Sequence, residues 1–152
     1  MQPAGIARVV TGRSFGPLRA MPLQGRSVAT DYLREANDGT LTLAMIETRT
    51  ALANVDAIAA TPGIDALFIG PYDLSTALSG GKAQDVTAPE VEKAIDKICA
   101  AAVKAGKIPG IYCRDAERGL AMRQRGFKFI TIGSDHAMLR DGIAAQVKAL
   151  KS

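Results

Sequence analysis

A strand that runs directly into a helix is written in residues 66–78, ALFIGPYDLSTAL. The apolar run Ala66–Ile69 has the length of a strand, and Gly70-Pro71 ends it with a stiff, tight turn. A short helical turn is expected to follow over Asp73–Leu78. This stretch therefore predicts one strand–turn–helix unit.

The same order of strand and helix is expected three more times along the chain. Near-continuous apolar runs of strand length occur at Leu41–Ile46, Ile108–Cys113 and Phe129–Ile132. Strands that are apolar throughout are buried on both faces, which is typical of a parallel sheet covered by helices. The remaining helices are expected at Thr50–Ala60, at Pro89–Ala105, at Asp115–Arg125 and from Ser134 or Asp135 toward Leu150.

Two architectures fit this α/β pattern. An open doubly wound sheet and part of a (β/α) barrel both place helices over a parallel sheet. The first strand is not followed by a GxGxxG motif, which argues against a dinucleotide-binding domain. Four units are also only half of the eight that a closed barrel requires. The pattern alone does not choose between the two.

The first 29 residues differ from the rest of the chain. They are rich in Gly, Arg, Pro and Ser, lack periodicity, and are expected to form an irregular, loop-rich segment. Thr30 is expected to cap a short helix over Asp31–Asn37, which Gly39 ends. We therefore expect one domain over residues 1–152, in which residues 30–152 form four βα units.

The composition indicates an ordinary globular domain. The chain has 152 residues, of which 47% are hydrophobic and 22% charged, and it has no apolar stretch of about 18 residues that could span a membrane. Without a basic, apolar leader at its N-terminus, it is expected to be cytoplasmic. The net charge of +4 is interpreted as a solvated surface together with an anionic small substrate. A content of 5% aromatic residues and no Trp disfavours a base-stacking surface. Cys99 and Cys113 are expected to be buried, reduced thiols.

Polar side chains that follow the strands are the candidates for chemistry, because ligands gather at the carboxyl ends of parallel strands. Glu47 and Asp73 lie at equivalent points of consecutive units. On neighbouring strands their carboxylates would repel each other, and a divalent cation such as Mg²⁺ or Mn²⁺ resolves that repulsion. Waters and substrate would complete its coordination. The alternative is that each carboxylate only stabilises the start of the helix that follows it.

The turn after the second strand has the features of an anion site. Gly70 allows close approach to the backbone, and Pro71 stiffens the turn. Amide groups at the start of the Asp73 turn are free to bind a carboxylate. A carboxylate site beside a metal ligand is the arrangement that a 2-keto acid requires.

Two motifs resemble those of the HpcH/HpaI aldolase family, which comprises metal-dependent pyruvate aldolases. They are Ile46-Glu47-Thr48-Arg49 and, in residues 63–75, GIDALFIGPYDLS. The resemblance covers nearly the whole chain and implies the C-terminal half of a TIM-type (β/α) barrel, a single aldolase-like domain of four βα units. The other matching segments are residues 3–6, 31–38, 107–111 and 130–135.

The resemblance implies a carbon–carbon lyase that cleaves a 4-hydroxy-2-oxo or 2-keto-3-deoxy acid to pyruvate and an aldehyde. Glu47 and Asp73 would be the metal ligands, for Mg²⁺ or Mn²⁺, with Co²⁺ as a further candidate. Gly70, Pro71 and Asp73 would bind the substrate carboxylate. The expected partners are a small 2-keto acid and further copies of the chain, and neither nucleic acid nor a membrane is expected.

The sequence departs from the family pattern at several positions. Met45 stands where the family usually has a Gln that hydrogen-bonds the substrate. The family's catalytic His and substrate-binding Arg lie on earlier strands that have no counterpart here. His136 is expected to be a solvent-facing residue in the first turn of the last helix. No catalytic residue is therefore assigned, and we expect a truncated, weakly active enzyme.

Two other functions stay open at this point. A non-catalytic half-barrel could serve as a binding or assembly module, because its uncovered sheet face and open edges would promote association. A phosphate-binding barrel enzyme would instead hold its anion at Gly133-Ser134 and the start of the last helix.

Overall fold

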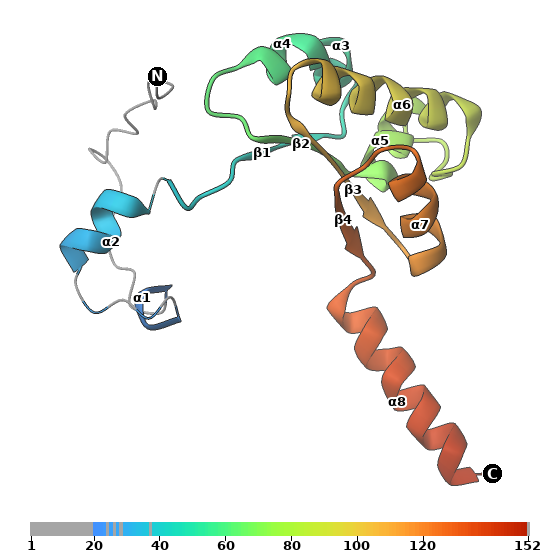
Figure 1. Ribbon diagram of the computed structural model, residues 1–152. Coiled ribbons are helices and arrows are strands. Elements are labelled where there is room, and N and C mark those ends of the chain that lie inside the picture. The colour runs from blue at the N-terminus through green and yellow to red at the C-terminus, as the bar shows by residue number, and fades with distance from the viewer. Residues whose placement is uncertain (1–19, 24, 26, 28, 37, 152) are drawn as a thin grey trace. The chain divides into compact units, whose positions relative to one another are not determined.

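The computed structural model describes residues 20–23, 25, 27, 29–36 and 38–151 (Figure 1). The chain divides into two units, Met1–Thr42 and Leu43–Ser152, which are considered separately below. Residues 1–19 of the expected loop-rich segment lie outside the described residues.

The first unit holds two short helices, α1 (Ala20–Leu23) and α2 (Ala29–Glu35). The prediction that residues 1–29 are irregular is therefore wrong at α1. A turn follows this helix, in which the Gly25 amide donates to the Pro22 carbonyl at 3.0 Å. Thr30 is not the cap of α2, because the helix already begins one residue earlier.

The second unit is built on a parallel sheet, as predicted. Its strands are β1 (Leu43–Ile46), β2 (Ala66–Ile69), β3 (Ile108–Cys113) and β4 (Phe129–Ile132), and they pair in sequence order. The first strand is shorter than the expected Leu41–Ile46. The pairing of β1 with β2 begins at Leu43, which lies opposite Ala66, the first residue of β2.

Six helices follow or separate these strands in the described part of the second unit. Their bounds are α3 (Arg49–Ala53), α4 (Val55–Ala60), α5 (Pro71–Leu78), α6 (Pro89–Lys104), α7 (Ala116–Gln124) and α8 (Asp135–Lys151). None of the described helices is long and apolar enough to cross a membrane.

The helix expected over Thr50–Ala60 is two helices, because Asn54 interrupts it. The Asn54 side chain donates to the Thr50 carbonyl at 2.8 Å, and its backbone amide donates to the same carbonyl at 3.1 Å. Short polar side chains compete with the helical backbone in this way. The helix expected over Asp73–Leu78 begins two residues earlier, at Pro71. The helix expected from Asp115 begins one residue later, because Asp115 is the N-cap of α7.

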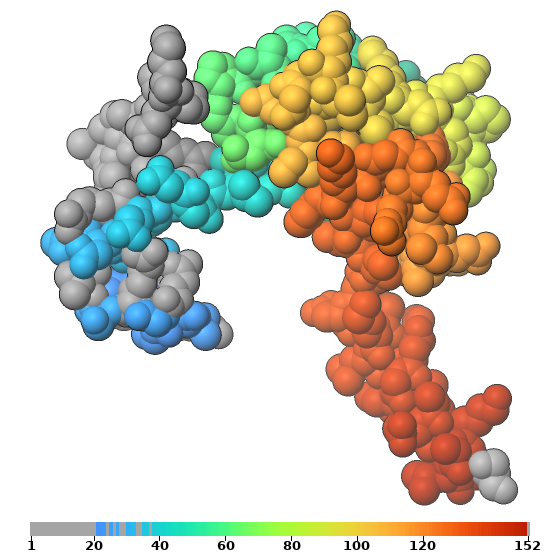
Figure 2. Space-filling model, in the orientation of Figure 1, coloured from blue at the N-terminus to red at the C-terminus, as the bar shows by residue number. Residues whose placement is uncertain are grey.

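One face of the sheet packs against helices and forms the core. Ile46, Ile69 and Ile111 lie side by side in the register, and each is at most 1% exposed. They pack in one cluster with buried residues of α4, α6 and α7. In the space-filling view the outer surfaces of the chain from α4 to α7 adjoin one another, from green to orange (Figure 2). Fully burying one such side chain contributes about 1.5–3 kcal/mol. Cys99 and Cys113 are both buried free cysteines, as predicted.

The opposite face of the sheet, called the open face below, carries the next register row. This row runs Met45, Phe68, Gly110 and Phe129. Met45 is 53% and Phe129 40% exposed, as expected for a face that helices do not cover. The Phe68 and Phe129 rings meet edge to face across Gly110 at 5.8 Å between centroids. Gly110 makes room for them, because a Cβ there would lie 2.9 Å from Phe68 Cδ2.

Arg49 fixes α5 beside the end of β1. Its Nε donates to the Ala77 carbonyl at 2.7 Å, and its Nη2 donates to the Leu78 carbonyl. These are carbonyl groups at the C-terminal end of α5, where a positive charge also complements the helix dipole. Arg49 therefore links the residues that follow β1 to the helix that follows β2.

We predict that Gly110→Ala lowers the free energy of unfolding by about 1–3 kcal/mol, because the added methyl group overpacks the space between Phe68 and the neighbouring backbone. Urea denaturation followed by circular dichroism measures this. The control is Gly142→Ala in α8, where nothing lies within 4 Å and stability should hold or rise. Equal stability of Gly110→Ala and the parent chain would contradict the packing described for the open face.

We predict that Arg49→Gln lowers the free energy of unfolding by about 1 kcal/mol, since it removes the hydrogen bonds to the end of α5. The matched control is Arg123→Gln, at an exposed position of α7. If both variants unfold at the same urea concentration, Arg49 does not hold α5 in place.

Candidate functional site

Glu47 follows β1, and Asp73 comes after the neighbouring strand β2. Both therefore lie at the carboxyl edge of the sheet, which is the edge at which the strands end. Ile46 pairs with Ile69 at the ends of β1 and β2. Extending this register by one residue places Glu47 beside Gly70. Asp73 is the third residue of α5, in its first turn. The parallel pairing thus puts both carboxylate residues at the same edge, and their joint use as metal ligands stays a prediction.

Gly70 leaves the space that the Glu47 carboxylate occupies. A Cβ on Gly70 would lie 2.4 Å from Glu47 Oε2 and 3.4 Å from Glu47 Cβ, so any larger residue would displace the carboxylate. The backbone of Gly70 has φ −93° and ψ 88°, which does not require glycine. The need for glycine here comes from the close approach of Glu47.

The helix-capping alternative fails for Glu47. The N-cap of α3 is Thr48, whose hydroxyl accepts from the Ala51 amide at 3.1 Å. Asp73 lies in the first turn of α5, where the helix dipole favours a carboxylate, although Gly70 is the N-cap. Capping therefore does not explain why a carboxylate stands at position 47. It explains the one at position 73 only through the place of Asp73 in the first turn of α5.

The start of α5 has the first-turn amides that the sequence analysis expects to bind a carboxylate, and this binding stays a prediction. Pro71 occupies the first helical position, and Leu74 donates its amide to the Gly70 carbonyl at 2.9 Å, which closes the first turn. Amides of a first helical turn have no partner within the helix, and their dipoles favour an anion. Within the described chain, no three His, Cys, Asp or Glu side chains gather into a metal site. A cation held by two carboxylates would therefore need substrate or water as further ligands.

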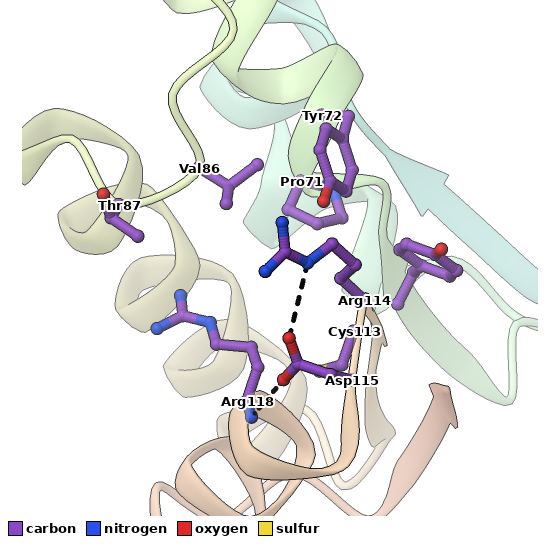
Figure 3. A pocket seen from close by; sticks show the side chains of 9 residues that line it. Pro71, Tyr72, Val86, Thr87, Cys113, Arg114, Asp115 and Arg118 are labelled. Atoms are coloured by element: carbon purple, nitrogen blue, oxygen red, sulfur yellow. Dashed lines mark hydrogen bonds and ion pairs between the residues drawn. The ribbon is translucent and has the colours of Figure 1, made fainter. Parts of the chain in front are cut away.

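A pocket of about 200 Å³ lies next to these residues, between α5 and α7 (Figure 3). Tyr72 and Tyr112 face each other in it, edge to face, with ring centroids 6.0 Å apart. Sequence reasoning missed this pair, because only the register shows that Tyr112 comes next to Gly70. The lining residues are Pro71, Tyr72, Val86, Thr87, Tyr112, Cys113, Arg114, Asp115 and Arg118.

Asp115 organises the charged side of this pocket. Its Oδ1 accepts from the Arg118 amide at 2.9 Å, and its Oδ2 lies 3.4 Å from Arg114 Nε. The backbone hydrogen bond from Arg118, followed by Arg114, holds the pKa of the Asp115 carboxyl below its usual value. Burial raises the pKa of the Cys113 thiol, which keeps it protonated and unreactive.

Two residues singled out in the sequence, Met45 and His136, lie away from this pocket's lining. Met45 is on the open face, and His136 is exposed in the first turn of α8, as predicted. α8 follows β4, at the far edge of the sheet from β1. Asp135 places a negative charge in that first turn, which disfavours the phosphate site proposed at Gly133-Ser134.

Comparison with known proteins relates this geometry to a family. The model of the family described as HpcH/HpaI aldolase/citrate lyase matches residues 18–142. A hydroxypyruvate/pyruvate aldolase of Rhizorhabdus wittichii is 42% identical over 127 residues, which cover 84% of this chain and 49% of that protein. A 5-keto-4-deoxy-D-glucarate aldolase of Klebsiella pneumoniae is 40% identical over 124 residues, which cover 80% of this chain and 46% of that protein.

Solved structures of the same family share the fold. An HpcH/HpaI aldolase/citrate lyase family protein from Burkholderia cenocepacia superimposes with a TM-score of 0.76 at 30% identity, covering 92% of this chain and 53% of that one. The chain thus spans about half the length of the relatives that it matches, and its four parallel βα units correspond to part of their TIM-type barrel. The expected family is confirmed: the chain belongs to the HpcH/HpaI aldolase/citrate lyase family.

Proposed function

We propose that this chain carries the metal and pyruvate part of a class II aldolase site. The reaction would cleave a 4-hydroxy-2-oxo or 2-keto-3-deoxy acid to pyruvate and an aldehyde. The observation that carries the proposal is the position of Glu47 against Gly70, at the edge where Asp73 also lies. Relatives named as aldolases for hydroxypyruvate or pyruvate and for 5-keto-4-deoxy-D-glucarate support the reaction class.

The residues present fit a divalent cation. Glu47 and Asp73 would hold Mg²⁺ or Mn²⁺, or Co²⁺ as an alternative, because hard cations take carboxylate oxygens and leave positions for water and substrate. Gly70 provides the space that keeps the Glu47 carboxylate at the sheet edge. A bound cation would supply Lewis-acid polarisation of the keto oxygen of the substrate.

The start of α5 would orient the substrate. Gly70 and Pro71 shape the turn, and the first-turn amides through Asp73 would hold the carboxylate of the 2-oxo acid. This fixes the C3–C4 bond relative to the metal ligands. Cleavage also needs a base that takes the proton of the C4 hydroxyl and an acid that returns a proton to C3.

No residue of this chain is proposed as that base. Its single histidine, His136, follows β4, the last strand in the sheet order. Glu47 follows β1, the first strand, so two strands separate the strands that they follow. Water or a group outside these 152 residues would have to move the proton. Loss of general acid–base help typically costs 10²–10⁴-fold in rate, which is why slow turnover is proposed for this chain.

We predict that the chain binds Mn²⁺ and releases pyruvate from a 4-hydroxy-2-oxo acid in the presence of that metal. Glu47→Gln should abolish both, because it removes a metal-binding charge while keeping the side-chain size. Gly70→Ala should weaken Mn²⁺ binding at least tenfold through displacement of the Glu47 carboxylate, with the fold intact because φ at Gly70 is ordinary. Calorimetric Mn²⁺ titration and a coupled pyruvate assay measure these effects.

The outcomes separate the aldolase from its alternative. Pyruvate release that survives Glu47→Gln would contradict the proposed site. Mn²⁺ binding without any turnover would favour a binding or assembly module instead.

The assembly module is kept as a second candidate because of the open face. Met45 and Phe129 are large apolar residues that are 53% and 40% exposed in one register row. Exposed apolar groups of this kind promote association, as does a sheet whose edge strands β1 and β4 have no further strand beside them in the described part of the chain. Homo-oligomer formation is therefore part of the proposal in either case.

We predict that the chain is oligomeric at micromolar concentration and that Phe129→Lys shifts it toward monomer. Sedimentation velocity over a range of concentrations measures this. The matched control is Leu120→Lys, since Leu120 is 59% exposed but lies on α7. A concentration-independent monomer for the parent chain would rule out association through the open face.

A further inference from the structure

The segment that carries Glu47 also holds the far end of α5. Two residues after Glu47, the Arg49 guanidinium donates through Nε to the Ala77 carbonyl at 2.7 Å and through Nη2 to the Leu78 carbonyl. The other end of the same helix carries Asp73 and the first-turn amides of the candidate site. Through α5, Arg49 therefore connects the segment of one candidate metal ligand to the turn that holds the other.

Both contacts of Arg49 in the described part of the chain go to backbone carbonyls. They lie in the last turn of α5, where the carbonyl groups have no partner within the helix. A guanidinium presents its N–H groups in one rigid plane, whereas an ammonium group is a single flexible point. Two bonds from one rigid group to consecutive carbonyls fix the direction of the helix end as well as its position.

α5 is also held at its middle. Leu74 is fully buried and Ser75 is 2% exposed, so the centre of the helix is seated in the core. Asp73 precedes this centre, and Ala77 and Leu78 follow it. Because a short helix moves as one rigid element, a tilt about its buried centre displaces both of its ends. The contact at the C-terminal end thus also determines where the first turn lies.

The helix is short enough for this coupling to be direct. At a rise of about 1.5 Å per residue, Asp73 and Leu78 lie about 7.5 Å apart along the helix axis. The buried centre lies between them, so a displacement of one end is matched by a displacement of similar size at the other. A misplacement of about 1 Å is enough to weaken a site whose groups must meet a ligand together.

The other hydrogen bonds at the end of α5 come from the chain that follows it. Ser79 Oγ donates to the Thr76 carbonyl at 3.0 Å and accepts from the Ala83 amide at 3.1 Å. The Gly81 amide donates to the Thr76 carbonyl at 2.8 Å. These bonds join neighbours in the sequence and can move together with the helix. The Arg49 bonds instead come from the segment that follows β1, so they restrain α5 relative to that segment.

We propose that Arg49 is a positioning residue of the candidate site, which sets the place of the first turn of α5 relative to Glu47. The inference rests on the proposed function, because it takes Glu47 and Asp73 to share one metal and the amides that begin α5 to hold the substrate carboxylate. It adds a residue that contacts neither ligand and determines how tightly both are bound.

The affinities of the full chain for Mn²⁺ and for pyruvate test the proposal. Calorimetry gives the Kd of Mn²⁺, and then that of pyruvate in the presence of saturating Mn²⁺, for variants that circular dichroism shows to be folded. We expect Arg49→Gln to raise both Kd values about tenfold through the displaced first turn. Arg49→Lys should give intermediate values, because lysine keeps the charge and loses the planar pair of donors.

The matched control is Lys97→Gln. Lys97 is likewise a cation that donates to a backbone carbonyl of a neighbouring helix, but its acceptor is Leu52 of α3, at 3.3 Å. Its loss should leave both Kd values unchanged. A second readout needs no ligand: the amide NMR shifts of residues 72–74 should move in Arg49→Gln and stay in place in Lys97→Gln. A role of Arg49 in stability alone would move neither the shifts nor the Kd values of the folded chain.

The outcomes separate this inference from the proposed function. If Arg49→Gln is folded and binds both ligands as tightly as the parent chain, Arg49 only stabilises α5, and the inference is overturned while the metal site stands. Equal weakening by Lys97→Gln would also overturn it, because the effect would not be specific to α5. If Arg49→Gln does not fold, Arg49→Lys is judged by the same comparison. If the parent chain binds neither ligand in a way that needs Glu47, the proposed function fails and the inference fails with it.

Discussion

The parallel pairing of β1 with β2 is the constraint on which the candidate site depends. It aligns Ile46 with Ile69, and so brings Glu47 against Gly70 one residue later. A shift of one residue would turn Glu47 toward the helix-covered face and Ile46 toward the open face. The buried isoleucine row therefore fixes the position of the carboxylate, because that row loses its burial if the register slips. Arg49 adds a second restraint, from the end of β1 to the end of α5.

The two faces of the sheet have different roles. The face with Ile46, Ile69 and Ile111 packs against helices and supplies the stability of the second unit. The open face carries Met45, Phe68 and Phe129. Two residues farther along the chain from Met45, Phe68 and Gly110 come Glu47, Gly70 and Tyr112, which therefore lie on the same side of the sheet. Stability and candidate chemistry thus lie on opposite sides of one layer. Changes to the open face should affect association and binding more than folding, except at Gly110, where the Phe68 ring and the neighbouring backbone leave no space for a side chain.

Much of this arrangement could be predicted from the sequence. The three strands Ala66–Ile69, Ile108–Cys113 and Phe129–Ile132 were predicted with their observed bounds, because each is a short, mostly apolar run between polar or turn residues. Asn54 was missed, since its effect on the helix is a side-chain hydrogen bond that periodicity does not reveal. The Tyr72–Tyr112 pair was missed because its two members lie on different βα units. Glu47 and Asp73 were predicted as metal ligands because both follow neighbouring parallel strands, and that role stays a prediction. The register aligns Glu47 with Gly70, so Asp73 lies three residues farther along, in the first turn of α5.

A crystal structure grown with Mn²⁺ and pyruvate tests the central claim most directly, through the anomalous signal of the metal. The account predicts one Mn²⁺ about 2 Å from a carboxylate oxygen of both Glu47 and Asp73. It also predicts the pyruvate carboxylate at the amides that begin α5. A metal bound elsewhere, or bound by only one of these two carboxylates, would contradict it.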